Sequence, residues 1–435
     1  MAVQLQDVRL LRRPAFRRLL ESRVLGHTAQ NATLYALFIL VVKENGSSFD
    51  SAVLLAALTV PTIVFGVPAG LIVDLLPRRL TLTLGYLARL GIAILVTREA
   101  DSLTAIYLLA AANSCAGMFL GPAESATVPA VVEPPQLASA NSWMILSQIV
   151  SQVLGMVVLA PLLIKQVSMD SVFIVTAVLF AGAACITGVL GRGFTARRPP
   201  ALAEPARAVR EATRLLAFNR SAYLATVYLT AAGLLSKVLV VLLPNFTRDV
   251  LDIAVEDTVF VAAPAAIGAG AGILLAPPLC RLGAVRVAAA AFALFLLGLL
   301  ALGFVADLRD FIRANLDLGI SFVEREVGVS SVIPVTMILA IPIGLAYTVN
   351  SVASRVVLNE ETPQRFQGRT FAIQSVLGDV VSLGPVLAIG ALADVAGAGT
   401  TLIASTVFVM LLSVYLTVLR RPQGQQHPDG VEGDR

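Results

Sequence analysis

Twelve apolar stretches, each long enough to cross a membrane, follow one another along this chain of 435 residues. An α-helix rises 1.5 Å per residue, so roughly 20 apolar residues span the hydrocarbon core of a bilayer. The stretches lie near residues 24–42, 51–73, 80–97, 104–121, 138–164, 171–190, 221–243, 257–279, 287–305, 332–353, 371–393 and 400–419. Backbone polar groups in lipid must be hydrogen-bonded within the protein, and runs of this length achieve that as helices. The sequence therefore predicts an all-α membrane protein with twelve transmembrane helices.

Charged side chains are scarce outside a few short segments. They make up 14% of the residues, whereas 57% are hydrophobic, and an ordinary soluble protein carries about 25% charged residues. The net charge of +4 does not indicate a nucleic-acid partner, because the basic residues flank the apolar stretches, where they set topology. We therefore expect membrane lipid, and no nucleic acid, around this protein.

The twelve stretches fall into two sets of six. The predicted order is a basic segment at 1–23, a six-helix bundle at 24–191, a linker at 192–220, a second bundle at 221–421 with an insertion at 307–330, and a disordered tail at 422–435. Residues 132–136 and 360–364 carry similar short motifs at an offset of 228 residues. The halves therefore look like duplicates, and duplicated halves around a midplane site are typical of transporters.

The distribution of Lys and Arg predicts the orientation. With the N-terminus inside, the cytoplasmic segments hold 22 basic residues and the outer segments hold 7. The positive-inside rule favours this arrangement, and an even number of helices returns the C-terminus to the same side. We expect a multi-pass protein of the bacterial inner membrane with both termini in the cytoplasm and the 307–330 insertion outside.

The turn after the second stretch carries a compact motif, because residues 66–79 read GVPAGLIVDLLPRR. Gly66 and Gly70 are four residues apart, which lets two helices approach closely. Asp74 at the membrane edge can pair with an arginine or cap a neighbouring helix N-terminus. Such a contact would hold one conformation and break in another. The alternative is a solvated aspartate beside basic residues.

This turn resembles the signature of the major facilitator superfamily, Gly-x-x-x-Asp-Arg-x-Gly-Arg-Arg. Leu75 and Pro77 depart from it, replacing the usual Arg and Gly. The residues that match are Gly70, Asp74, Arg78 and Arg79, with Arg281 and Gly283 in the corresponding turn of the second half. The resemblance implies two six-helix bundles related by a pseudo-twofold axis, a central cavity, alternating access, and a gating role for Asp74.

Other segments resemble the macrolide-efflux and enterobactin-exporter branch of that superfamily. The resemblance begins with residues 11–20 before the first stretch and continues in both halves. The further matching positions are Gly121, Pro122, Ala123, Pro129, Leu137, Ala140, Asn141, Pro363, Gly368, Arg369, Gly384, Pro385, Gly390, Ala393 and Asp394. This branch implies proton-driven efflux of a drug, siderophore or metabolite, without fixing the substrate.

Polar side chains inside the apolar stretches indicate the transport pathway. Arg89 lies near the centre of the third stretch, where an unpaired charge costs a few kcal/mol or more. It is either a substrate or coupling arginine or a member of a structural ion pair, whereas Lys237 can snorkel outward. The neutral candidates are His27, Gln30, Asn31, Asn113, Asn141, Gln148, Gln152 and Gln374. We expect these to face a water-filled cavity, and the alternative is hydrogen bonding between helices.

Two carboxyl groups are the candidates for carrying protons. Asp379 is the deepest acid in the stretches and is the first choice, and Glu124, nearer the cytoplasmic mouth, is the second. A buried carboxyl group can exchange protons during a transport cycle. Each is alternatively a structural hydrogen-bond partner.

Motifs for enzymatic chemistry do not occur in the sequence. It contains no Gly-x-x-x-x-Gly-Lys-Ser/Thr loop, metalloprotease helix or Gly-x-Ser-x-Gly elbow. We expect no enzyme activity, no cofactor, no bound metal and a monomeric state. The predicted function is export of a small amphipathic compound in exchange for protons. The alternatives are uptake or lipid flipping by the same fold, or a membrane receptor or scaffold that does not transport.

Overall fold

A computed structural model describes residues 10–99, 102–133, 136–189, 219–305, 307, 332–361 and 367–419. In these ranges twelve helices are long and apolar enough to cross a membrane, and the predicted all-α class is confirmed. The linker at 192–218, the insertion at 308–330 and the tail lie outside the described residues.

The first six spans form one bundle. Its helices are α2 (Pro14–Asn45), α3 (Ser48–Leu75), α4 (Arg78–Val96), α5 (Leu103–Val131), then α6 (Leu137–Gln152), η2 (Val153–Leu159) and α7 (Ala160–Gln166) as one continuous span, and α8 (Met169–Gly188). The second bundle comprises α10 (Arg220–Asp249), the short η3 (Val255–Asp257), α11 (Thr258–Cys280), α12 (Ala284–Gly303), α15 (Val332–Glu361), α16 (Gln367–Ala396), and α17 (Ala398–Val414) continued by η4 (Tyr415–Leu419).

Several helices are longer than the apolar stretches that predicted them. Helix α2 begins at Pro14, ten residues before the predicted start, and α5 continues past Pro122 to Val131. A hydropathy window stops where polar residues begin, but a helix can continue into the interfacial region, and proline is tolerated within transmembrane helices. This extension has a consequence for the site: Arg23, expected in the basic segment before the first span, is a residue of helix α2.

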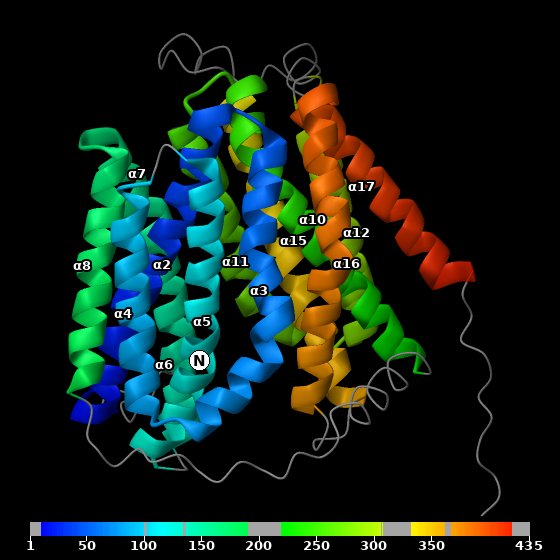
Figure 1. Cartoon of the computed structure of the whole chain (residues 1–435). Helices are drawn as coiled ribbons and strands as arrows, with labels where there is room; N and C mark the ends of the chain where they lie inside the picture. Colours follow the sequence, from blue (N-terminus) through cyan, green and yellow to red (C-terminus); the bar gives the residue numbers. More distant parts are fainter. Residues whose placement is uncertain are drawn as a thin grey trace, which may run out of the picture.

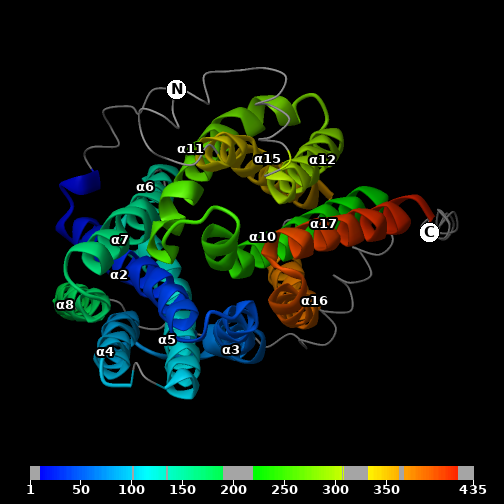
Figure 2. The same ribbon diagram turned by 90° about the horizontal axis from the view of Figure 1, so that it is seen from above.

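Seen from above, the two bundles lie side by side (Figure 2). They meet where α3 packs against α16 and α10, and also where η2 approaches α11. Each bundle has its own apolar interior. Buried aromatic side chains such as Phe173 and Phe180 pack in the first bundle, and Phe246 and Phe295 pack in the second. The apolar residues exposed around the outside are those expected to face lipid.

Polar contacts join the two bundles at one end of the molecule, which we call the closed end. Asp394 of α16 accepts hydrogen bonds from Ser47 Oγ at 2.6 Å and from the backbone N–H groups of Ser48 at 2.6 Å and Phe49 at 3.1 Å. Asn245 and Arg248 of α10 also contact this segment. The remaining contact is an ion pair between Lys165 and Asp257.

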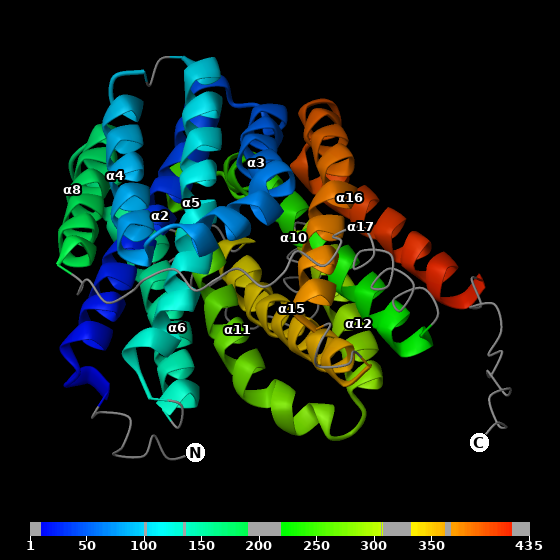
Figure 3. The same cartoon turned by 60° about the horizontal axis from the view of Figure 1, so that its bottom comes forward.

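Helices α3 and α16 touch most closely at the closed end. A Cβ atom on Gly390 would lie 2.7 Å from the Ala52 Cβ atom and 2.9 Å from the Ser48 carbonyl oxygen, so only glycine allows this approach. Toward the opposite end, where α4 begins at Arg78, the two helices separate (Figures 1 and 3). Among the described residues, these contacts therefore hold the two bundles together at the closed end.

Candidate functional site

Glu124 of α5 is the centre of a buried polar cluster in the first bundle. The residue is 1% exposed. Its Oε2 atom forms an ion pair with Arg23 and lies 3.2 Å from His27 Nε2. The Tyr86 hydroxyl group donates a hydrogen bond to Oε1 at 2.8 Å. Two helices, α2 and α4, therefore direct polar groups to one carboxylate on α5, and we call these four residues the Glu124 cluster.

The spacing of residues along α2 explains part of this cluster. Arg23 and His27 are four residues apart, so they lie on the same helix face. The Arg23 guanidinium also donates to Gln148 Oε1 at 3.1 Å and to Ser147 Oγ at 3.2 Å on α6. The residues His27, Gln148 and Glu124, each predicted to belong to the pathway, are thus brought into one hydrogen-bonded group. Sequence reasoning missed Arg23 and Tyr86 as members.

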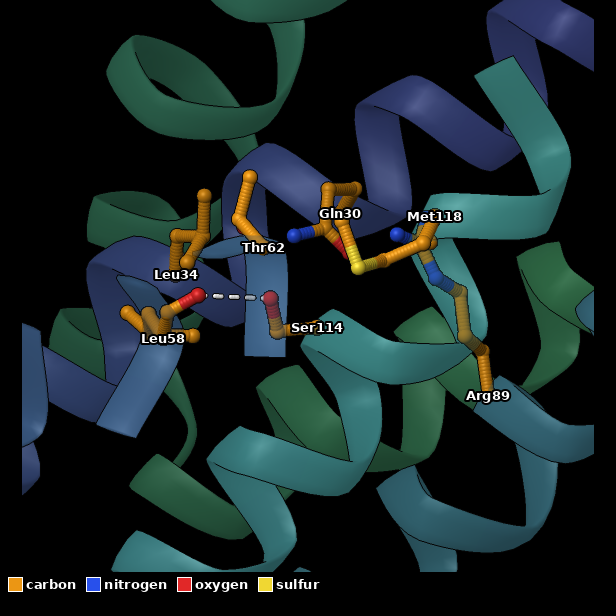
Figure 4. A pocket seen from close by; sticks show the side chains of 8 residues that line it. Gln30, Leu34, Leu58, Thr62, Arg89, Ser114 and Met118 are labelled. Atoms are coloured by element: carbon orange, nitrogen blue, oxygen red, sulfur yellow. Dashed lines mark hydrogen bonds between the residues drawn. The ribbon is translucent and has the colours of Figure 1, made fainter. Parts of the chain in front are cut away.

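A cavity of about 350 Å³ lies between α2, α3, α4 and α5 of the first bundle (Figure 4). Arg89 of α4 forms part of its wall and is 8% exposed. Its Nε atom has no hydrogen-bond partner among the described residues. The complete lining is Gln30, Leu34, Leu58, Thr62, Arg89, Ser114, Gly117 and Met118. The predicted pathway residues Arg89 and Gln30 therefore share one cavity.

Gly117 makes room for the Arg89 side chain. A Cβ atom at this position would overlap Arg89 Nη2, so the guanidinium could not stay where it lies. The Phe180 ring packs on the guanidinium with its centroid 5.8 Å from Cζ. Figure 4 shows the guanidinium end directed toward Gln30 and Met118. The local packing therefore aims the cation at the cavity.

Neutral polar groups complete the cavity wall. Gln30 Oε1 accepts a hydrogen bond from Asn113 Nδ2 at 3.2 Å. Ser114 Oγ donates to the Leu58 carbonyl oxygen at 2.6 Å, as the dashed line in Figure 4 shows. These bonds link α2 with α5 and α3 with α5. Residues of this group therefore both line the cavity and form hydrogen bonds between helices, the two roles that the sequence left as alternatives.

The second bundle contains a mid-membrane ion pair. Lys237 Nζ of α10 lies 2.6 Å from Asp379 Oδ1 of α16 and also donates to Ser382 Oγ at 2.6 Å. Both ionic side chains are about three-quarters buried. The outward-snorkelling alternative for Lys237 is wrong, because a carboxylate within reach binds its ammonium group. Asp379, the first choice for a proton carrier, is therefore paired with a cation, as Glu124 is.

The other predicted residues are dispersed. Asn31 donates to the His27 carbonyl oxygen of its own helix at 2.8 Å, Gln152 is exposed, and Gln374 is buried in α16. Arg78 and Arg79 open α4 in the first bundle, while Arg281 and Gly283 form the turn between α11 and α12, where Gly283 has φ 117°. The side chains of Gly70, Asp74 and Asn141 lie outside the described residues. Within the described ranges, no three His, Cys, Asp or Glu side chains gather as metal ligands.

The sequence between residues 24 and 385 matches the profile of the Major Facilitator Superfamily. The chain belongs to this superfamily. No curated protein matches the sequence.

Solved structures of superfamily transporters share the fold. A mutant of the nucleoside transporter NupG is 13% identical and superposes with a TM-score of 0.74 over 94% of this chain and 100% of that one. A bacterial homologue of the iron transporter ferroportin in an inward-facing state is 14% identical, with a TM-score of 0.66 over 93% and 98%. A bacterial homologue of the human lysosomal transporter Spinster, also inward-facing, is 11% identical, with a TM-score of 0.68 over 96% and 97%. At these identities the likeness concerns the fold alone, which is that of a major facilitator transporter.

Proposed function

We propose that this chain is a proton-coupled secondary transporter that exports a small amphipathic compound across the bacterial inner membrane. The superfamily and the transporters that share the fold support a role in transport. The direction of transport, the coupling ion and the substrate class are our proposal. The resemblance of several segments to macrolide and enterobactin exporters favours export.

The basic residues assign the two ends of the molecule to the two sides of the membrane. The end that carries Arg78, Arg79 and Arg281 belongs to the side richer in Lys and Arg by 22 to 7, and the positive-inside rule places it in the cytoplasm. The closed end then faces outward, and the structure corresponds to an inward-facing state.

The Glu124 cluster carries the proposal for proton coupling. A carboxylate that is 1% exposed within a membrane-spanning bundle is expensive unless it is paired or protonated. Its main partner here is the Arg23 cation, so the carboxylate is held in its charged form. Protonation of Glu124 would remove this attraction and free Arg23. Binding of a proton to Glu124 would therefore break the ion pair with Arg23, and release of the proton would restore it.

Alternating access then couples the protonation of Glu124 to the opening of the closed end. In the inward-facing state the proton has left Glu124 to the cytoplasm, and the ion pair with Arg23 is formed. Opening of the closed end requires loss of the bonds between Asp394 and the start of α3. In the outward-facing state Glu124 is reloaded from outside, and the cycle exchanges protons for the exported compound.

Proton movement in everted membrane vesicles tests this proposal. A pH-sensitive dye inside acidified vesicles reports proton release while macrolides, siderophores and organic anions are added in turn. We expect release with one class of compound, its loss in Glu124→Gln, and its retention in Glu21→Gln, a matched variant of an exposed glutamate on α2. Silence across the panel with folded protein in the membrane would contradict proton-coupled export.

A further inference from the structure

We infer that the cavity beside Arg89 recognises an anionic group, so that the transported compound is a small organic anion, such as a carboxylate or a phosphate ester, with an apolar body. This inference rests on the proposal that the chain transports a small molecule. It adds the chemical class of the substrate and the group that binds it.

Two mostly buried arginines, Arg23 and Arg89, share one carboxylate inside the first bundle, since Glu124 also attracts Arg89 from beyond ion-pair distance. Arg23 and Glu124 form an ion pair, and both are mostly buried. Arg89 is the further buried cation, and among the described residues it makes no ion pair. In the second bundle, Lys237 and Asp379 neutralise each other. Because an unpaired charge in the membrane interior is costly, an anion in the cavity would restore the balance.

The hydrogen-bonding groups of the cavity also favour an anion. The Arg89 guanidinium has five N–H donors and no acceptor, and its Nε–H group has no partner among the residues that the structure describes. Gln30 already uses its Oε1 atom to accept from Asn113, so its NH₂ group is left to donate. Ser114 gives its proton to Leu58, so its hydroxyl oxygen can only accept further bonds. The residues that line the cavity include no Asp or Glu, and its only charged group is the Arg89 guanidinium, a pure donor.

The contact of Arg89 with Phe180 does not use up its hydrogen-bond donors. The ring centroid lies 5.8 Å from Cζ, and a cation–π contact is an electrostatic attraction to the ring rather than an N–H hydrogen bond. A carboxylate or phosphate can accept two parallel bonds from the edge of an arginine, a geometry that a lysine does not provide. Gly117 leaves the space that the guanidinium occupies.

The remaining walls set the size and the apolar character of the ligand. Leu34, Leu58 and Met118 supply apolar surface to the same cavity. The volume of about 350 Å³ lies near the lower end of the range for small-molecule sites, roughly 300–1,000 Å³. The anion is thus a compact molecule rather than a peptide or a polymer.

Thermal unfolding of the purified full chain in a neutral detergent tests the inference without any gradient. The probes are 2-naphthoate and 2-naphthyl phosphate, the neutral 2-naphthamide and the cationic 2-naphthylmethylamine. We expect the two anions to raise the unfolding midpoint, and Arg89→Gln to weaken their binding about tenfold or more, the loss typical of one charge-assisted hydrogen-bonding group. The control is Arg98→Gln, an exposed arginine just past the end of the same helix, which should respond like the wild type.

Two further variants keep the test decisive if Arg89→Gln does not fold. Arg89→Lys keeps the positive charge but cannot donate two parallel hydrogen bonds, so anions should still raise its unfolding midpoint, by less than in the wild type. Gly117→Ala displaces the guanidinium and should weaken the response while the charge remains. Stabilisation by lysophosphatidylglycerol but not by the soluble anions would identify the anion as a lipid headgroup and overturn the assignment to a free small molecule, whereas stabilisation by the soluble anions supports that assignment.

The outcomes separate this inference from the proposed function. Equal stabilisation by the amine, no stabilisation by any anion, or an undiminished response in Arg89→Gln would each overturn the anion assignment. Anion stabilisation that depends on Arg89 in a protein that releases no protons in vesicles would contradict proton-coupled export and leave the assignment standing.

Discussion

Asp394, near the C-terminal end of α16, accepts a hydrogen bond from the backbone N–H group of Ser48, the first residue of α3 in the other bundle, at 2.6 Å. A carboxylate at a helix N-terminus satisfies free N–H groups and interacts favourably with the helix dipole. Helix α3 itself ends at Leu75, one residue after Asp74, and α16 begins at Gln367. Each helix of this pair thus carries an aspartate near its C-terminal end, and the aspartate that forms the contact at the closed end is Asp394.

Asp394→Asn should loosen the closed end. Loss of a charged cap costs about 1 kcal/mol, which changes a two-state population roughly fivefold. In a cysteine-free background, the reaction of Ser51→Cys, at a fully buried position of α3, with an impermeant maleimide should accelerate by that factor. Asp170→Asn, at an exposed position in the first turn of α8, should leave the rate unchanged. Equal rates in all three proteins would contradict a latch at Asp394.

Gly390→Val should keep the closed end from closing. Its side chain would clash with Ala52 and with the Ser48 carbonyl oxygen on α3, and neither backbone can yield without separating the helices. We expect faster maleimide labelling at Ser51→Cys and slower transport. Gly384→Val in the same helix is the matched control, because no atom lies within 4 Å of a Cβ there. If the Gly384 variant opened the end as much as the Gly390 variant, the steric account would be wrong.

Glu124→Gln should destabilise the protein, because it leaves the Arg23 cation without its carboxylate. Removing one member of a buried ion pair typically costs about 3–5 kcal/mol. The double variant Arg23→Gln/Glu124→Gln should recover part of this loss, and a double-mutant cycle measured by thermal unfolding gives the coupling. Additive effects of the two substitutions would show that the pair is energetically unimportant.

Exchanging Lys237 and Asp379 with each other should impair the protein less than removing the charge of either residue alone. Each single substitution, Lys237→Gln or Asp379→Asn, leaves one mid-membrane charge without its partner and should reduce the folded yield and the transport rate. The exchanged pair Lys237→Asp/Asp379→Lys restores neutrality and should recover part of both. Recovery of folding without transport would assign the pair a structural role alone.

The sequence predicts the twelve helices because their signal is local hydropathy, and it singles out Arg89 and Glu124 because polar side chains stand out in apolar runs. It does not reveal which groups meet. Arg23 lies at the border of a span, where an arginine is ordinarily a topology marker, and Tyr86 resembles any other lipophilic residue of α4. The contact of Lys237 with Asp379 joins positions 142 residues apart, and the cap at Asp394 exists only because α3 and α16 approach at Gly390. Such pairings depend on tertiary packing, which no local pattern encodes.

Proton-coupled alternating access is the central claim, and a distance measurement across the closed end tests it most directly. Spin labels at Val167 in the first bundle and Val395 in the second, which are 69% and 88% exposed, would be introduced as cysteines after replacement of Cys115, Cys185 and Cys280. Pulsed electron spin resonance of the protein in lipid nanodiscs at several pH values then reports the distances. We expect a short and a long population whose ratio changes with pH in the wild-type background and stays nearly constant in Glu124→Gln. A single short distance at every pH, or an undiminished pH response in the variant, would contradict the account.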